Sequence, residues 1–507
     1  MSDSEQKTER DTMDEVPSVN EAHQPTSATT QEPQSRTNEL KDGGYGCYVP
    51  DEKEINVDFG GLSRVVVTAA ALLNFHTWGL NSSYAVFLAY YLRNQTIEGA
   101  SSLGFAFVGG LSIGIALLVS PIATALVGLK GFGTRKTIWL GTVFETASFI
   151  GASFTSELWH LILSQGICFG VGMGLIFVAS VPVPSQWFTK KRSLANACAA
   201  AGSGFGGLTY SLGTNAMISS IGLDWTFRVL AIICFVVNCI CGFLIRDRNK
   251  AVGSVHIALN WKLFKRPSYL FYLAWMSLSL IPYTALIFSI VDYSQYVGLS
   301  ASHASLVGAL LNLSQGLGRP IIGVSSDAVG RLNVAGLCTA FVGVLCLVLW
   351  VFSFTLATCI VFALLAGSCA GVIWATAAPV LAEVVGLQLL PSALSLTWVV
   401  LVLPATFAEV IVLEIRQRSY RGAQLFIGFM YLLAFVFIWL LRAWKVRELD
   451  LARLESKEQR EHAIHDDDYA VAHEIRHENS RAERASIASK AKEGLSIAKG
   501  LFAWRKV

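Results

Sequence analysis

Arg319, Asp327 and Arg331 are the charged residues of the segment GRPIIGVSSDAVGR, which joins two long apolar runs. Charge is costly at the depth of a lipid bilayer, so these side chains predict a binding or gating role. Arg319 lies inside the end of an apolar run, whereas the glycines predict a turn around Asp327 and Arg331. A short acidic and basic turn between two spans is typical of a transporter, whose inner loops break and reform as the protein changes shape.

A second turn of this kind follows an earlier apolar run, where residues 131–136 read GFGTRK. In both places glycine allows the backbone to reverse, and an arginine can cap the exposed carbonyl groups of a neighbouring helix end. Ordinary loop chemistry is the alternative explanation. The matched positions favour a duplicated fold, with Arg135, Asp327 and Arg331 as gating residues.

Polar side chains inside the apolar runs are few, so each is a candidate for contact with a solute. Asn74, His76 and Asn81 lie in the first run, and His76 could bind and release a proton near neutral pH. A neutral histidine bonded to a neighbouring helix is the alternative. Further candidates for lining a polar cavity, or for bonding between helices, are Gln165, Tyr283, Asn312, Gln315 and Trp374.

Three carboxyl groups near or inside the runs receive less weight. Glu145 lies midway along the third run, and we interpret it as a protonated carboxyl in a structural bond, with a proton site as the alternative. Glu383 and Glu409 fall near span ends, where solvation is cheap, and they indicate little.

No residue pattern predicts a metal site or a cofactor. Nine of the 10 cysteines lie in apolar runs, where a thiol acts as a small hydrophobic group, and Cys239 and Cys241 are too close together for a usual zinc pair. The glycines of 202–207 lie in an apolar helix with no preceding strand, which argues against a nucleotide site. Without a Walker motif we expect no ATP-driven pump, and without a nucleophile–base or metal cluster we expect no enzyme. The net charge of +3 gives no reason to expect nucleic acid.

The chain that positions these residues has 507 residues, of which 53% are hydrophobic and 15% charged, and a mean hydropathy of +0.51. Apolar stretches of about 20 residues can cross a bilayer as helices. Twelve such spans are expected, at 65–91, 103–126, 137–155, 158–181, 194–218, 226–245, 269–291, 303–324, 333–353, 357–381, 390–413 and 423–444. The longest link follows the sixth span. The sequence therefore predicts an all-α membrane protein with twelve transmembrane helices in two six-helix pseudo-symmetric halves.

Charge and composition predict the orientation of the chain in the membrane and its division into domains. Lysine and arginine concentrate in loops on one side, which predicts that side and both tails to be cytoplasmic. A sequon at Asn94 lies on the predicted outer side, and the segment 487–504 is either a solvated tail or a helix on the inner membrane surface. The predicted domains are a disordered cytoplasmic N-tail (1–62), a six-helix bundle (63–245), a cytoplasmic linker (246–267), a second six-helix bundle (268–444) and a cytoplasmic C-tail (445–507).

Several motifs together resemble the major facilitator superfamily and, within it, the fungal branch of the monocarboxylate porter family. The resemblance covers about residues 42–445. The segments that carry it are DGGYG at 42–46, NFHTWG at 74–79, SSY at 82–84, SQG at 164–166, QWF at 186–188, KRSLA at 191–195, AAAGSGFGGL at 199–208, WTFR at 225–228 and GRP at 318–320.

The resemblance implies a rocker-switch transporter in which helices one, four, seven and ten line a central cavity. In animal members an arginine just before a proline of the eighth helix pairs with the substrate carboxylate, and Arg319 matches it. This chain departs from that pattern, because Gln315 stands where those members have an acid and Ser82 stands near the place of their first-helix lysine. Both departures weaken a proton-plus-monocarboxylate interpretation, and His76 then becomes the alternative proton site.

In the family the DGGYG signature runs almost directly into the first helix. Here residues 47–64 intervene, with many charges and no resemblance to a span. Our hypothesis is a retained intron or an error of the gene structure, and transcripts that consistently contain this segment would contradict it.

The sequence thus favours a secondary transporter of a small organic solute, with a monocarboxylate-like anion and proton coupling as the leading interpretation. Another small metabolite or a vitamin as solute, and a non-transporting membrane sensor of the same fold, are the alternatives. The expected partners are the solute, H+ and the lipid bilayer. The plasma membrane is the expected location, with the vacuolar and mitochondrial membranes as alternatives.

Overall fold

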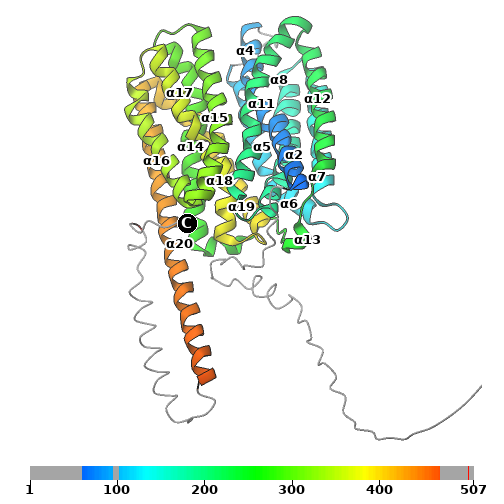
Figure 1. The fold of residues 1–507 in the computed structure, drawn as a ribbon. Helices are drawn as coiled ribbons and strands as arrows, with labels where there is room; N and C mark the ends of the chain where they lie inside the picture. The colour runs from blue at the N-terminus through cyan, green and yellow to red at the C-terminus, as the bar shows by residue number, and fades with distance from the viewer. Residues whose placement is uncertain (1–59, 95–101, 469–500, 502–507) are drawn as a thin grey trace, which may run out of the picture. The chain divides into compact units, whose positions relative to one another are not determined.

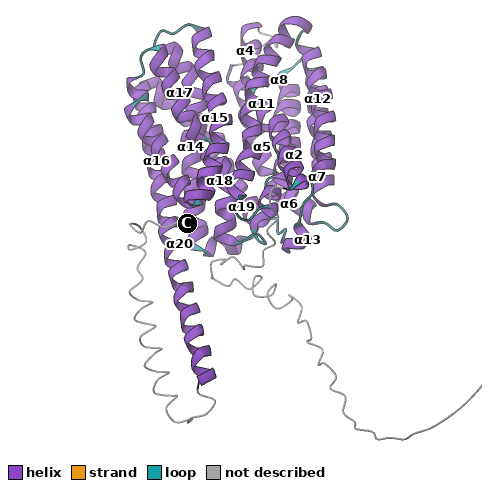
Figure 2. Ribbon diagram, viewed as in Figure 1, coloured by secondary structure: helices purple, strands orange, loops and turns teal. Residues whose placement is uncertain are grey.

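The computed structural model describes residues 60–94, 102–468 and 501 (Figure 1). Within these ranges the chain forms helices joined by short loops and no strands (Figure 2). The helices of the first half are α2 (Gly61–Asn74), η1 (Phe75–Gly79), α3 (Leu80–Ser82), α4 (Tyr84–Asn94), α5 (Ser102–Leu118), α6 (Ser120–Gly128), α7 (Gly133–Ala152), α8 (Leu158–Leu161), η2 (Ile162–Cys168), α9 (Phe169–Ser180), α10 (Pro182–Trp187), α11 (Arg192–Ile221) and α12 (Leu223–Leu244).

A short linker with α13 (Asn249–Val252) and η3 (Trp261–Lys265) leads into the second half. Its helices are α14 (Pro267–Tyr296), α15 (Ala301–Val329), α16 (Arg331–Val348), η4 (Trp350–Phe352), α17 (Leu356–Ala370), α18 (Val372–Val385), α19 (Leu390–Arg418) and α20 (Tyr420–Asp468). Consecutive short helices continue one another across the bilayer, so the described residues form twelve spans, six in each half. The predicted fold class is confirmed.

Eight of the described spans are long and apolar enough to cross a membrane by length and composition alone. The remaining four begin at α2, α7, α11 and α15, and they contain the buried polar residues His76, Glu145 and Arg319. Large apolar side chains are exposed around the bundle, for example Ile232, Phe243 and Ile321. Exposure of that kind over a whole bundle is expected where lipid is the solvent.

Glycine determines how closely α11 approaches its neighbours. A Cβ atom at Gly202 would lie 1.9 Å from the carbonyl oxygen of Ala71 in α2, and one at Gly204 would lie 2.7 Å from the backbone nitrogen of Gly316 in α15. Small residues allow helix backbones to come into contact in this way. Helix α11 therefore lies directly between the first span of its own half and α15 of the other half.

We expect Gly202→Ala to destabilise the protein, because backbone atoms of α2 must move to admit the methyl group. Overpacking of this kind costs typically about 1–3 kcal/mol. Gly213→Ala on the same helix is the matched control, because its Cβ would meet nothing within 4 Å. The measurement is thermal unfolding of the purified protein in detergent. Equal melting temperatures for the two variants would contradict the close approach of α11 and α2.

The structure corrects one prediction about the segment 318–331. The span predicted to end at 324 continues to Val329, so Asp327 lies in the last turns of α15, and only Gly330, with a φ of 118°, reverses the chain. The glycines serve packing instead, because a Cβ at Gly318 would lie 2.2 Å from the carbonyl oxygen of Ser368 in α17. The turn predicted at residues 131–136 is confirmed at its start, where Gly131 and Gly133 have φ values of 82° and 72°.

The ends of the chain are only partly described. The predicted N-tail up to residue 59, the sequon beyond Asn94 and most of the segment 487–504 lie outside the described residues. Helix α2 begins at Gly61, so residues 61–64 belong to the first span and not to the intervening segment. Helix α20 continues to Asp468, well beyond the predicted span end at 444. The domain boundaries stay a prediction.

Candidate solute cavity and gate

A cavity of about 1130 Å³ lies between the two halves. Its wall comes from α2 to α5 and α9 to α11 of the first half and from α14, α15, α18 and α19 of the second. The volume is slightly above the range of roughly 300–1,000 Å³ of ordinary ligand pockets. Seven sequence candidates line it, namely Asn74, Asn81, Tyr283, Asn312, Gln315, Arg319 and Trp374.

Arg319 is the buried cation of this cavity, with only 3% of its surface exposed. Its Nη1 donates to the carbonyl oxygen of Ala200 at 2.6 Å and to Oγ of Ser203 at 2.5 Å. Its Nη2 donates to Oε1 of Gln315 at 3.1 Å and to the hydroxyl of Tyr283 at 3.3 Å, while Nε has no partner. Among the described residues no carboxylate lies within ion-pair distance of this guanidinium. Its positive charge is therefore stabilised only by hydrogen bonds to neutral groups of the described residues.

The space for this guanidinium comes from a break in the tenth span. Helix α17 ends at Ala370 and α18 begins at Val372, with Gly371 between them. A Cβ atom at Gly371 would lie 2.7 Å from Nε of Arg319. Any other residue there would displace the arginine, a role of Gly371 that the sequence analysis did not recognise.

Indole rings form one side of the cavity. Trp374 stacks on Trp398, with ring centroids 6.0 Å apart and planes tilted by 22°, and its centroid lies 5.4 Å from that of Trp78. Tyr283, which bonds Arg319, lies 6.1 Å from Trp374 on the same measure. Trp78 and Trp398 were not among the predicted site residues, since an aromatic residue in an apolar span is not distinctive.

The side-chain amides of Asn81 and Asn74, both in the first half, bond other parts of the cavity wall. Nδ2 of Asn81 donates to Oγ of Ser112 in α5 at 2.7 Å. Nδ2 of Asn74 donates to the carbonyl oxygen of Ala70 one turn earlier at 2.9 Å, and both residues line the cavity.

His76 and Gln165 lie outside the cavity wall as the structure describes it. Nδ1 of His76 is hydrogen-bonded to the hydroxyl of Tyr210, and Oε1 of Gln165 accepts from the hydroxyl of Tyr91 at 3.4 Å. Both residues lie in π-helical segments, η1 and η2, and both are buried. Of the two roles expected for Gln165, this conformation fits bonding between helices of the first half and not lining of the cavity.

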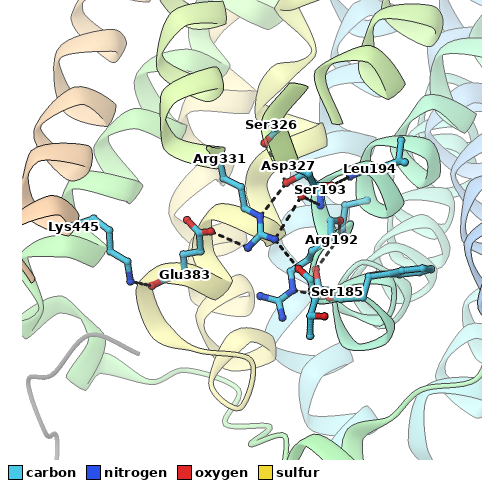
Figure 3. Close-up of polar contacts among 12 residues, drawn as sticks. Ser185, Arg192, Ser193, Leu194, Ser326, Asp327, Arg331, Glu383 and Lys445 are labelled. Atoms are coloured by element: carbon cyan, nitrogen blue, oxygen red, sulfur yellow. Dashed lines mark hydrogen bonds and ion pairs between the residues drawn. The ribbon is translucent and has the colours of Figure 1, made fainter. Parts of the chain in front are cut away.

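The two halves are joined at one end by a polar cluster (Figure 3). Oδ1 of Asp327 accepts from the backbone nitrogen of Ser193 at 3.0 Å, and Oδ2 accepts from that of Leu194 at 2.9 Å. These amides belong to the first turn of α11, whose positive dipole end favours an anion. An acid from α15 of the second half thus caps a helix of the first half.

Arg331 extends the same cluster. Its Nη1 donates to Oε1 of Glu383 at 2.8 Å and its Nη2 to the carbonyl oxygen of Thr189 at 3.0 Å, while Nε donates to Oγ of Ser193 at 3.1 Å. Nη2 also lies 3.5 Å from Oδ1 of Asp327. Figure 3 shows Arg331 between Asp327 and Glu383, with Lys445 of α20 donating to the carbonyl oxygen of Glu383 at 2.9 Å.

Comparison with known proteins decides the family. A family model described as the Major Facilitator Superfamily matches residues 67–293 and again residues 276–504. The chain belongs to the major facilitator superfamily. The protein named probable transporter MCH2 of Saccharomyces cerevisiae is 32% identical over 421 residues, which covers 81% of this chain and 89% of that protein.

Other similar proteins agree with this placement. The uncharacterized transporter ESBP6 of the same yeast is 32% identical over 405 residues, or 76% of this chain and 60% of that protein. The structure of the superfamily transporter FucP in the outward conformation has a TM-score of 0.58 at 12% identity, covering 75% of this chain and 99% of that chain. At that identity the likeness shows the fold alone. This superfamily member is thus a multi-pass membrane transporter and not an enzyme.

In this superfamily member the two halves use the matched turns differently. Nε of Arg135 donates to the carbonyl oxygen of Ile245 at 3.0 Å, just beyond the end of α12, so it caps a helix within its own half. Asp327 and Arg331 instead bridge the halves. Glu383 belongs with them, although the sequence analysis gave it little weight.

Proposed function

We propose that this chain is a secondary active transporter of a small monocarboxylate-like organic anion, coupled to protons and working by rocker-switch alternating access. The observation that carries the proposal is Arg319, a buried guanidinium in the cavity between the halves without a carboxylate partner among the described residues.

An unpaired charge away from water is energetically costly unless it is compensated. A carboxylate of the solute would compensate it with charge-assisted hydrogen bonds, which are about twice as strong as neutral ones. Tyr283, Gln315 and Ser203 already orient the guanidinium, and its Nε is still without a partner. The site therefore favours an anion over a neutral polyol as its ligand.

The indole wall supports an apolar or planar body on the same solute. Trp78 and Trp374 offer flat apolar surface beside Arg319, and the buried Trp398 stacks against Trp374. The cavity of about 1130 Å³ is much larger than a two- or three-carbon acid needs. We therefore propose carboxylates larger than lactate or pyruvate as the preferred solutes.

The closed end supports alternating access. The Asp327–Arg331–Glu383 cluster joins the halves at one end, while the cavity wall extends toward the other end as far as Ser219 of α11 and Gln295 of α14. Because the cluster lies on the side that lysine and arginine predict to be cytoplasmic, we propose that this is an outward-facing state.

The test is uptake by the purified full-length chain in proteoliposomes. Radiolabelled lactate, phenyllactate and a neutral sugar are compared at two external pH values with the same internal pH. We expect uptake of the carboxylates, larger for phenyllactate and greater at the lower external pH, and none of the sugar. Sugar uptake, or no flux of either acid, would contradict the proposal, and binding without flux would favour a sensor. A fluorescent fusion in yeast tests the proposed plasma-membrane location against the vacuole and mitochondrion.

A further inference from the structure

A buried polar cluster lies behind the cavity in the first half. It consists of His76 from η1, Glu145 from α7, Tyr210 from α11, and Cys234 and Asn238 from α12. The hydroxyl of Tyr210 is bonded to Nδ1 of His76, and Sγ of Cys234 donates to the carbonyl oxygen of His76 at 3.9 Å. Nδ2 of Asn238 donates to Oε2 of Glu145 at 2.7 Å. Glu145, Cys234 and Asn238 have 0% exposed surface.

One oxygen of the Glu145 carboxyl has no hydrogen-bond partner, which indicates its protonation state. Its Oε1 and Oδ1 of Asn238 are both buried without a partner, and no lysine or arginine of the described chain forms an ion pair with it. An ionised carboxylate with one hydrogen bond would be very costly there. A proton on Oε1 supplies the missing donor, and Oδ1 of Asn238 is an unpaired acceptor on the amide that already bonds this carboxyl.

We propose that Glu145 is the proton-binding site of this transporter, carrying a proton as a carboxylic acid paired with the Asn238 amide in this conformation and releasing it in the alternate one. The step is an acid dissociation, in which the O–H bond of the carboxyl breaks and the proton passes to water, leaving the carboxylate. The inference rests on the proposed function, because a site that loads and releases a proton drives transport only in a coupled carrier.

The first span connects this site to the cavity. Asn74 and Trp78 on one face of the segment line the cavity, while His76 between them faces the buried cluster. The π-helical turn of η1 lies at this point, and such turns are frequent at functional sites. A solute that moves Trp78 therefore also moves the turn that positions His76. Because His76 is bonded to Tyr210, the same movement changes the surroundings of Glu145.

The groups that titrate near Glu145 are few. Tyr210 from α11, Cys234 from α12 and His76 belong to the same buried cluster, and Sγ of Cys168 from η2 donates to the carbonyl oxygen of the neighbouring Phe144 at 3.2 Å. Helix α9 approaches the backbone of Glu145 at Gly172, where a Cβ atom would lie 2.6 Å from the nitrogen of Glu145. Small residues at the α7–α9 contact let these helices slide. A shift along this contact would change the burial of the carboxyl between the two states.

Glu145→Gln in the full-length chain tests the proposal. A glutamine amide donates to Oδ1 of Asn238 and accepts from its Nδ2, so the variant keeps the pairing of the protonated acid but has no proton to release. In proteoliposomes we expect counterflow of radiolabelled phenyllactate to remain, while accumulation driven by a pH gradient is lost. Glu157→Gln is the matched control, because that carboxyl is exposed at the start of α8. Unchanged gradient-driven accumulation in Glu145→Gln would overturn the proposal.

Infrared spectroscopy of the purified protein gives a second readout that needs no solute. We expect a carbonyl band of a protonated carboxyl that changes with pH in the wild type and in Glu157→Gln, and that is missing in Glu145→Gln. A Glu145 band that stays constant from acidic to alkaline pH would show a permanently neutral structural acid and overturn the inference. If phenyllactate is not transported at all, the solute assignment fails while this titration still decides the proton site. If Glu145→Gln does not fold, Asn238→Ser assigns the band, because loss of the amide bonded to this carboxyl should shift its frequency, and an unshifted band would overturn the inference.

Discussion

Arg319→Ala is expected to abolish solute uptake while the protein still reaches the membrane. The substitution removes the buried cation that we propose to bind the carboxylate, and with it the charge-assisted bonds of that pair. Loss of one partner of a buried charge pair costs about 2–5 kcal/mol, which corresponds to roughly 30-fold or more in the transport efficiency kcat/KM. The measurement is uptake of radiolabelled phenyllactate in proteoliposomes, with protein content determined on the same vesicles.

Arg319→Lys is the companion variant, because it keeps the charge but lacks the planar fork that bonds Ala200, Ser203, Gln315 and Tyr283. We expect it to bind the acid weakly, with a raised KM and partial activity. Arg416→Ala serves as the control for loss of an arginine, since its ion pair with Asp292 is partly exposed and of the kind that contributes little. Normal uptake by Arg319→Ala would remove this residue from the mechanism.

Asp327→Ala is expected to shift the protein away from the conformation described here. The backbone amides of Ser193 and Leu194 lose their cap, and Arg331 loses one of its two acidic neighbours. Breaking a mostly buried charge cluster costs about 3 kcal/mol, which changes the ratio of the two conformations on the order of 100-fold. Because the cluster exists only when this end is closed, the inward-facing state should gain population.

The shift is measured by labelling a cysteine at Ser211, which lines the cavity, with a membrane-impermeant thiol reagent from the open end. Labelling should fall strongly in Asp327→Ala, after subtraction of the signal from the native cysteines. Lys136→Ala is the control, because that exposed lysine only bonds the carbonyl oxygen of Gly131 at the matched turn of the first half. Equal labelling in both variants would show that the cluster does not hold the gate closed.

The charged residues were the part of the site that the sequence could predict. Arg319, Asp327 and Arg331 interrupt apolar runs, and a charge at that depth is rare enough to be noticed without a structure. Helical periodicity could also have separated His76 from the cavity, since Asn74, Trp78 and Asn81 share one helix face and His76 does not.

The sequence did not indicate the roles of Glu383 and Asn238, because their hydrogen-bond partners are distant in the chain. Glu383 bonds Arg331 across 52 residues, and Asn238 bonds Glu145 across 93. The turn predicted around Asp327 begins too early for another reason. The glycines of this segment indicated a turn, but close contacts with α17 and α11 hold Gly318 and Gly323 in a helix. Packing against neighbouring helices, which a single sequence does not show, makes this segment a helix and not a turn.

The stacked indoles of Trp374 and Trp398, with Trp78 beside them, have a practical consequence. They make the cavity its own optical reporter, because a solute that docks beside Arg319 changes the polarity around these rings and thus their fluorescence. Subtracting the spectrum of Trp374→Phe isolates this signal from the rest of the 13 tryptophans. Unlabelled compounds can therefore be ranked as ligands in detergent, before any radiolabelled solute has been synthesised.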